Sequence, residues 1–264
     1  MVTYQTIEVD ERDGFAEVTL NRPDVLNALD EQMATELRDA FREIREQRGV
    51  RAVLLKGAGR AFCAGGDVRV MEGSVDDNPA AFFEVPLERI HEAARELAEL
   101  PLPVVGAIHG FASGAGFNLA LCCDLLVSSA EARFNQAFVR IGAVPDTGGT
   151  FWLPRLVGAA RARELFLLGE LIDAKQALTM GIVNRVVPAE SLLTEARALA
   201  AKLATGPTQT YAEIKSLVLR SAGSTLSEAL DAEREAQLRN AATADFKEGV
   251  TAFVQKRPAR YQGR

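Results

Sequence analysis

The order of apolar and polar positions predicts alternating strands and helices over the first two thirds of the chain. Phe15–Leu20 alternates like a short strand and ends at the turn signal 21–23, Asn-Arg-Pro. Asp30 is a good helix N-cap, and the residues after it carry apolar side chains at helical spacing. These apolar positions are Met33, Leu37, Phe41 and Ile44. The pattern therefore predicts a strand, a turn and an amphipathic helix.

Further units of the same kind follow along the chain. Ala52–Leu55, Val104–Ile108 and Leu125–Val127 are short apolar runs typical of buried strands. Helical patterns cover Ala81–Leu100 and Gly114–Leu121, in the intervals between those strands. Repeated strand-then-helix units imply a mainly parallel, buried sheet, so the sequence predicts an α/β fold.

The character of the sequence changes after about Val187, where alanine, leucine and charged residues take over and strand signals stop. Thr225–Glu228 is a capping box, and Asp173–Gln176 resembles one. We therefore expect an α/β core over residues 1–195 and a helical region over residues 196–264. Such helices either pack on a sister subunit or cover their own core.

Composition narrows the function classes. Of 264 residues, 48% are hydrophobic, enough for a sizeable core, and this excludes intrinsic disorder. A net charge of −6 argues against nucleic-acid binding driven by bulk charge. No apolar run reaches the roughly 18 residues of a membrane span, and Met1–Asp10 lacks an apolar signal-peptide core. We expect no membrane partner.

Cysteine and histidine usage points the same way. The chain has two histidines, His91 and His109, and no CxxC or HExxH motif, so we expect no metal site. The adjacent cysteines Cys122 and Cys123 are not typical of the disulfide framework of a secreted protein, so we expect a reduced, cytoplasmic protein. His109 and Cys63 are interpreted as packed core or turn residues.

Two glycine-rich junctions follow predicted strands. Residues 61–67 (Ala-Phe-Cys-Ala-Gly-Gly-Asp) come after the strand at 52–55. Residues 110–116 (Gly-Phe-Ala-Ser-Gly-Ala-Gly) come after the strand at 104–108 and open a helix. One backbone N–H from each junction could converge on a single oxygen and stabilise an enolate or a tetrahedral oxyanion. Spacing alone favours the simpler interpretation, two tight turns in a packed fold.

Beyond these junctions, the chain resembles the crotonase superfamily, the enoyl-CoA hydratase/isomerase family, along essentially its whole length. The resemblance implies a crotonase (ClpP-like) spiral of ββα units with a helical C-terminal trimerisation region, assembled as a homotrimer or a dimer of trimers. Five ordered segments carry it: 21–23 with 27–29, 61–67, 103–124, 145–155 and 248–257.

The resemblance also implies a site for a coenzyme A thioester as substrate, with no cofactor. The backbone N–H groups of Gly66 and Ala115 would hold the thioester carbonyl. Arg22 would meet the phosphates, and Phe253 and Lys256 would come from a neighbouring subunit; for both cations the alternative is a solvated surface charge. The residues expected to line the adenine and pantetheine channel are Leu26, Ala28, Ala64, Asp67 and Val68.

The chain departs from the family's hydratases at two positions. Their two water-activating glutamates fall on Asn118 and Phe138, so ordinary two-glutamate hydration looks excluded. One acid remains nearby, Asp146, in a Pro-Asp-x-Gly sequence that by itself favours a structural turn. The chain here resembles isomerases of the ring-1,2-epoxyphenylacetyl-CoA type, which use an aspartate at this position. Asp146 is then the expected acid/base, in an apolar setting with Phe138 and Trp152, and Asn118 would orient the base or the substrate.

The resulting expectation is an acyl-CoA isomerase. It would convert a 3-enoyl-CoA to the 2-enoyl-CoA, or a ring epoxide to its oxepin in phenylacetate breakdown. The alternatives are a 2-enoyl-CoA hydratase (a lyase) of fatty acid metabolism using Asp146 and a water on Asn118, an aspartate-nucleophile dehalogenase or hydrolase with His91 as base, and a non-catalytic acyl-CoA binder. The acyl pocket is expected near Glu72–Val85 and Phe138, and the sequence does not identify the acyl group.

Overall fold

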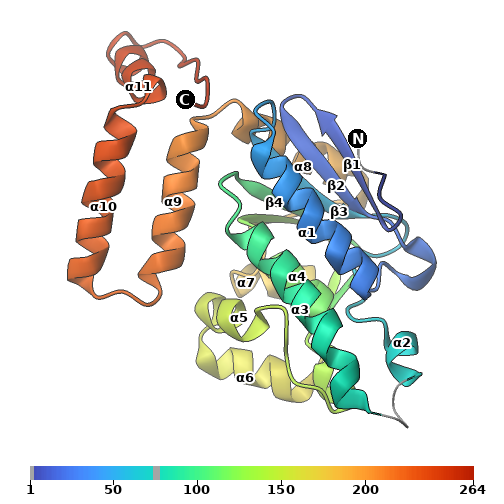
Figure 1. The fold of residues 1–264 in the computed structure, drawn as a ribbon. Helices are drawn as coiled ribbons and strands as arrows, with labels where there is room; N and C mark the ends of the chain where they lie inside the picture. The colour runs from blue at the N-terminus through green and yellow to red at the C-terminus, as the bar shows by residue number, and fades with distance from the viewer. Residues whose placement is uncertain (1–2, 74–77) are drawn as a thin grey trace.

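A six-stranded sheet forms the centre of the part of the chain that the computed structural model describes, residues 3–73 and 78–264 (Figure 1). Neighbouring strands from β2 onward are parallel, and β1 pairs antiparallel with β2 at one edge. The predicted, mainly parallel sheet is confirmed. Its spatial order is β1 (Ile7–Arg12), β2 (Phe15–Leu20), β3 (Ala52–Gly57), β4 (Val104–Ile108), β6 (Leu125–Ser129) and β9 (Arg185–Val187).

Strand β2 is more deeply buried than its alternating pattern indicates. All six of its residues are buried, including Glu17 at 2% exposure. Glu17 accepts two hydrogen bonds from the Arg197 guanidinium, at 2.7 and 2.8 Å, and these contacts hold the pKa of Glu17 below its usual range. Arg197 belongs to α8 (Leu192–Ala204), whose apolar face packs on this side of the sheet. Alternation suggested that Glu17 faces solvent, whereas in the structure it is buried under α8 and paired with the partly exposed Arg197.

The second sheet is smaller and carries the site. It comprises β5 (Phe111–Ser113), β7 (Arg133–Asn135) and β8 (Ile172–Asp173). β5 follows β4 after Gly110, which adopts φ +57°, and pairs in parallel with β7. The turn at Gly110 takes the chain from the large sheet to the small one, so β5 delivers the second glycine junction to the start of α4 (Ala115–Leu121).

The predicted helices are present with small changes at their ends. Asp30 caps α1 (Glu31–Glu46) by accepting the Met33 N–H at 2.8 Å, as predicted. α3 (Pro79–Ala98) begins and ends two residues earlier than expected, because Asn78 supplies its N-cap. The remaining core helices are α2 (Val68–Glu72), α5 (Gly149–Val157), α6 (Ala159–Leu168), α7 (Ala174–Thr179) and the 3-10 turns Pro23–Val25, Ala137–Ile141 and Ala189–Ser191.

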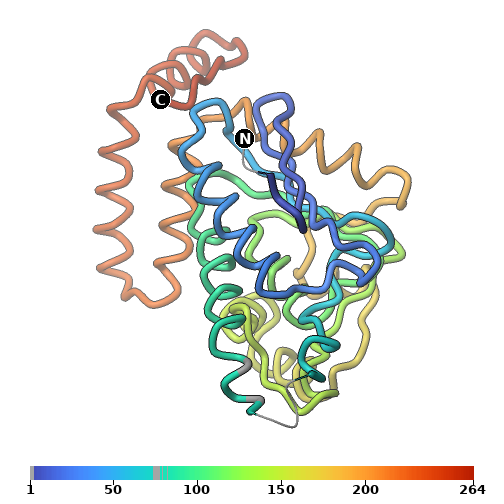
Figure 2. The backbone as a smooth tube through the Cα atoms, turned by 45° about the vertical axis from the view of Figure 1, so that its right-hand side comes forward, coloured from blue at the N-terminus to red at the C-terminus, as the bar shows by residue number. Residues whose placement is uncertain are grey.

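The C-terminal helices project from the core (Figures 1 and 2). They are α9 (Thr208–Ser221), α10 (Leu226–Ala241) and α11 (Ala244–Val254). Both predicted capping boxes are present, one at the start of α7 and one at the start of α10. The expected boundary at residue 195 falls inside α8, which packs on the sheet, so the projecting helices begin after Ala204. No helix in the described part of the chain is long and apolar enough to cross a membrane.

Candidate active site

At the first glycine junction, residues 61–67, the backbone N–H of Gly66 points away from the neighbouring segment at Leu29. Leu29 donates its N–H to Gly65 O at 2.7 Å and accepts from the Asp67 N–H at 3.0 Å. In this parallel bridge the bonds go to the residues on either side of Gly66, so the Gly66 N–H points away from Leu29. Gly65 adopts φ +99°, a conformation that side chains other than hydrogen rarely allow.

The second junction presents a helix start. Gly114 is the N-cap of α4, at φ +50°, and offers no side chain to cap it. Ala115 is the first helical residue, and its N–H has no intrahelical acceptor because the first N–H groups of any helix lack one. A Cβ on Gly65 would lie 3.6 Å from the Ala115 nitrogen and 2.8 Å from Ser113 O. The two junctions are therefore in contact.

Asp146 lies in the loop before α5 and is partly buried. The Thr147 hydroxyl donates to its Oδ1 at 2.7 Å. Burial raises the pKa of Asp146, while the Thr147 hydrogen bond and the electrostatic interaction with His91 act in the opposite direction. A carboxyl whose pKa is raised toward neutrality is suited to general acid/base catalysis. The structure thus places Asp146 at a partly buried position where burial raises its pKa, and its role as the acid/base stays a prediction.

Asn118 connects this loop to the second junction. Its Nδ2 donates to the backbone oxygen of Asp146 at 2.8 Å, and its Oδ1 accepts from Gln136 Nε2 at 2.7 Å. Asn118 is fully buried on α4, one turn beyond Ala115. Asp146 is thus tied to the helix whose first N–H belongs to the second junction.

Phe138 covers the same region with an apolar ring. Atoms of the ring lie 3.7 to 4.0 Å from where a Cβ of Gly114 would stand, and the residue is 8% exposed. Trp152 of α5 packs against the same loop, since a Cβ on Gly148 would lie 3.3 Å from its indole ring. Positions 118 and 138 therefore hold an amide and a phenyl ring, and neither carries an acid.

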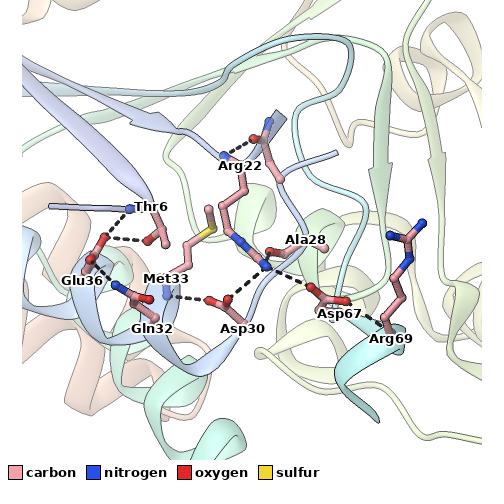
Figure 3. Close-up of polar contacts among 10 residues, drawn as sticks. Thr6, Arg22, Ala28, Asp30, Gln32, Met33, Glu36, Asp67 and Arg69 are labelled. Carbon is pink, nitrogen blue, oxygen red and sulfur yellow. Dashed lines mark hydrogen bonds and ion pairs between the residues drawn. The ribbon is translucent and has the colours of Figure 1, made fainter. Parts of the chain in front are cut away.

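Beside the first junction, Arg22 organises the segment expected to hold coenzyme A (Figure 3). Its guanidinium contacts Asp67 Oδ2 at 3.0 Å and Asp30 Oδ2 at 3.1 Å, and donates to Ala28 O at 2.5 Å. Asp67 also caps α2 by accepting the Arg69 N–H. Arg22 therefore joins the start of α1 to the start of α2, with its side chain 21% exposed.

The other expected channel residues adjoin this cluster. Leu26 adopts φ +54° after the turn at Pro23–Val25, and its carbonyl accepts the Ala64 N–H at 3.0 Å. Val68 begins α2 and is 54% exposed. The structure thus brings Leu26, Ala28, Ala64, Asp67 and Val68 into adjoining segments at the first junction.

Phe253 and Lys256 lie elsewhere in this chain. Phe253 is in α11 at 86% exposure, and the exposed Lys256 follows at φ +53°. α11 sits at one end of the projecting helices, apart from α2 and α4 in both views (Figures 1 and 2). The structure does not bring these two residues to the site of their own chain.

Cys63 and His109 make contacts that are typical of structural residues. Burial raises the pKa of the Cys63 thiol to about 12, and the thiol donates to Asn27 O at 3.0 Å. His109 Nε2 lies 3.1 Å from Gly59 O, and burial lowers the pKa of this histidine. Among the described residues there is no group of three or more His, Cys, Asp or Glu that could hold a metal.

Sequence reasoning missed two residues of this site, Thr147 and Gln136. Thr147 is fully buried at φ +51°, and a hydroxyl directly after a candidate base was its one signal in the sequence. Gln136 gave none, because its partner Asn118 lies 18 residues away. Of the stretch 72–85 expected to line the acyl pocket, residues 74–77 lie outside the described residues.

Comparison with known proteins places this geometry in a family. The model of the enoyl-CoA hydratase/isomerase family matches residues 10–264. A "Probable enoyl-CoA hydratase" of Rhodobacter capsulatus is 40% identical over 264 residues, 100% of both chains. The 1,2-epoxyphenylacetyl-CoA isomerase of Escherichia coli is 40% identical over 253 residues, 95% of this chain and 96% of the relative.

A solved structure agrees with the fold. The crystal structure of an enoyl-CoA hydratase from Polaromonas sp. superposes with a TM-score of 0.92 at 32% identity, covering 97% of this chain and 99% of the other. The crotonase-type α/β fold with a helical C-terminal region, which was expected from the sequence, is confirmed. The structure adds that its strands form two sheets.

Proposed function

The chain belongs to the enoyl-CoA hydratase/isomerase family, and from that premise we propose that it is an acyl-CoA isomerase with Asp146 as its acid/base. One observation carries the proposal. Of the three positions around the second junction where this family's enzymes place acids, 118 and 138 hold an amide and a phenyl ring, and 146 holds a partly buried carboxylate. This is an arrangement for moving a proton without holding a nucleophilic water.

In the proposed reaction the thioester oxygen of a 3-enoyl-CoA accepts hydrogen bonds from the N–H groups of Gly66 and Ala115. The Asp146 carboxylate removes a proton from the carbon next to the thioester, and the negative charge moves onto the oxygen as a dienolate. The same carboxyl group returns the proton to the far end of the diene, giving the conjugated 2-enoyl-CoA. Preorganised backbone donors stabilise the charge as it develops.

A ring-1,2-epoxyphenylacetyl-CoA is the second substrate class within this proposal. The Escherichia coli relative carries that activity in its name, at 40% identity over nearly the whole chain. Here too one carboxyl group transfers a proton near an enolised thioester. Phenylacetate breakdown is the pathway this substrate would imply, and fatty acid metabolism the one implied by a 3-enoyl-CoA.

Coenzyme A is proposed to bind along the first junction. Leu26, Ala28, Ala64 and Val68 would line the adenine and pantetheine channel, beside Asp67. Arg22 would reach the phosphates from its place between two carboxylates. Phe253 and Lys256 would be supplied by a neighbouring subunit of a homotrimer or dimer of trimers. The position of α11 at the end of the projecting helices supports this.

Enoyl-CoA hydration is the second candidate, because the Rhodobacter capsulatus relative is named as a hydratase at the same identity. It would require a water activated by Asp146 and held by Asn118. Both ends of the Asn118 amide already bond to protein groups, the Asp146 carbonyl and Gln136. This leaves the amide less suited to holding a water, and favours isomerisation.

The test compares two reactions on one preparation, hydration of crotonyl-CoA and isomerisation of 3-hexenoyl-CoA. We expect isomerisation to dominate, and Asp146→Asn to abolish it while a saturated acyl-CoA still binds. Near-normal turnover in Asp146→Asn would refute the proposed role. Dominant hydration would favour the hydratase. Release of halide from a haloaryl-CoA would favour an aspartate nucleophile with His91, and binding with no turnover would leave an acyl-CoA binder.

A further inference from the structure

Two buried amides hold the loop that carries Asp146. Gln136 precedes the 3-10 turn Ala137–Ile141, Asn118 belongs to α4, and Asp146 precedes α5. Gln136 Nε2 donates to Asn118 Oδ1 at 2.7 Å, and Asn118 Nδ2 donates to Asp146 O at 2.8 Å. Both amide residues are 0% exposed. Three separate segments therefore meet through one chain of hydrogen bonds.

The direction of this chain is fixed at its loop end. The Asp146 backbone oxygen can only accept, so Asn118 must turn Nδ2 toward it and Oδ1 toward Gln136. Gln136 must in turn donate, which leaves its Oε1 buried and without a hydrogen-bond partner among the described residues. Buried acceptors are seldom left unpaired. The direction of these hydrogen bonds is thus maintained although Oε1 of Gln136 is left without a hydrogen-bond donor among the described residues.

The loop is also packed tightly against the Asn118 amide. A Cβ on Gly149 would overlap all three end atoms of that side chain. Gly149 donates its own N–H to Asp146 O at 2.9 Å, so the carbonyl receives hydrogen bonds from both the amide and the helix start. Rotation of the Asn118 amide would therefore disturb the backbone at Asp146 directly.

We propose that Gln136 is a positioning residue for Asp146, acting through the Asn118 amide. The proposal rests on the proposed function of Asp146 as the acid/base. A base must stand within hydrogen-bond reach of the carbon-bound proton that it removes, and small displacements of reacting groups are costly. Gln136 fixes the orientation of Asn118, Asn118 fixes the backbone at Asp146, and the carboxylate follows.

The variant Gln136→Glu tests this with almost no change of shape. When it is ionised, this glutamate accepts only, so Asn118 must turn Nδ2 toward it and present Oδ1 to the Asp146 carbonyl. Two acceptors then face each other and the loop moves outward. A protonated glutamate would still donate, so the assay is made at alkaline pH and beside Gln136→Met, which has no donor at any pH. For 3-hexenoyl-CoA isomerisation we expect kcat to fall roughly 10- to 100-fold, because an ångström of misplacement costs that much. KM should change little.

The pH profile separates positioning from a merely structural role. A loop displaced toward solvent hydrates the Asp146 carboxylate, so the acid limb of kcat should move to lower pH. In the wild type, His91 of α3 is the other titratable group that acts on Asp146 among the described residues, and the variants leave it in place. The charge of the new glutamate would itself raise the pKa of Asp146, so the shift of the acid limb to lower pH is measured in Gln136→Met, which adds no charge. Gln136→Met, of similar length and without a donor, should lower kcat in the same way if the glutamate variant fails to fold.

Asn240→Asp is the matched control. Asn240 is a buried amide on α10 that accepts from the Thr210 hydroxyl and donates to Ala236 O, within the projecting helices. We expect its kcat and pH profile to match the wild type. Folded Gln136→Met and Gln136→Glu enzymes that both have normal kcat and unchanged pH profiles would overturn the positioning role while Asp146→Asn stays inactive. Turnover in Asp146→Asn itself would instead overturn the function on which the role rests.

Discussion

The Thr147 hydroxyl donates a 2.7 Å hydrogen bond to Oδ1 of Asp146, the residue before it in the chain. Thr147 is fully buried and adopts φ +51°, a left-handed conformation that β-branched residues rarely take. Such conformations persist where surrounding structure enforces them, commonly at functional sites. The hydrogen bond favours the ionised carboxylate, and burial favours the protonated form, so the two oppose each other at one group.

The first prediction concerns the pH dependence of turnover. As the proposed base, Asp146 must be ionised, so we expect kcat to fall as the pH drops through its pKa. Thr147→Val removes a hydrogen bond to the ionised form and should raise the pKa of Asp146 further, moving the acid limb of kcat to higher pH. Thr147→Ser keeps the hydroxyl and is the control. A Val variant whose limb moves to lower pH would show that another group sets it.

Stability should change with pH in the opposite sense to that of a salt-bridged carboxylate. The folded-state pKa of Asp146 lies above the unfolded value, so its contribution is fully present below the unfolded pKa. That contribution is lost as the pH rises through the folded pKa. Asp146→Asn should therefore resist urea better than the wild type at pH 7.5, and the difference should shrink toward pH 4. Asp231→Asn, at an exposed position on α10, should show no comparable gain.

The backbone donor proposed at Ala115 can be removed by one substitution. Ala115 is the first residue of α4, where proline is tolerated because its missing N–H has no helical acceptor. Ala115→Pro should lower kcat by about 10²- to 10³-fold, the usual effect of deleting one oxyanion donor. Ala159→Pro is matched, since Ala159 also begins a helix after a glycine N-cap. It should keep normal turnover, and an equal loss in both variants would indicate a general helix effect.

The fold was predictable where the signal is local. The N-cap Asp30, the apolar face of α1 and both capping boxes depend on residues three or four apart, and each is present. The edge strand β1 was not predicted, because the exposed face of Ile7–Arg12 is acidic and resembles a polar terminus. The full burial of β2 depends on Arg197, 180 residues from Glu17, and no local pattern contains that contact.

The same difference between local signals and long-range contacts applies to the candidate site. The glycine junctions could be found because each follows a predicted strand, and Asp146 could be found because a family resemblance supplied its position. The role of Asn118 could not, since its two partners lie 18 and 28 residues away in other elements. Arg22 appeared as a free cation for phosphate, whereas in the structure two carboxylates surround it. Whether an acidic side chain neutralises the charge of Arg22 depends on which loops come together in the fold, and a single sequence does not contain that information.

The fourth prediction separates the structural contacts of Arg22 from phosphate binding. Arg22→Gln should raise KM for a CoA thioester roughly tenfold or more, because hydrogen bonds to charged groups contribute about 1.5–3 kcal/mol. The same acyl group on pantetheine lacks the nucleotide phosphates, so its KM should stay unchanged. Equal increases for both substrates would mean that Arg22 acts through Asp30 and Asp67 alone. Arg42→Gln, at an exposed arginine paired with Glu96, is the control.

The last prediction concerns the origin of Phe253 and Lys256. If a neighbouring subunit lends these residues to the site, two defective variants should complement each other. Asp146→Asn retains Lys256 and lacks the base, and Lys256→Glu retains the base and lacks the cation. In randomly assembled mixed oligomers about a quarter of the sites combine an intact base with an intact neighbour. Co-expressing the two chains should therefore recover measurable isomerase activity.

The amount of recovered activity shows whether the site is shared between neighbouring subunits or is complete within one chain. A site complete within one chain gives turnover no higher than the sum of the separate variants, since every mixed site keeps one defect. Pairing Asp146→Asn with Ala115→Pro is the control, because both residues lie in the same chain's site and no neighbour supplies either. Because Phe253 is 86% exposed in the single chain, Phe253→Ala should behave like Lys256→Glu in the same mixtures. Complementation by both variants, and none by Ala115→Pro, would place α11 of one subunit against the coenzyme A segment of the next.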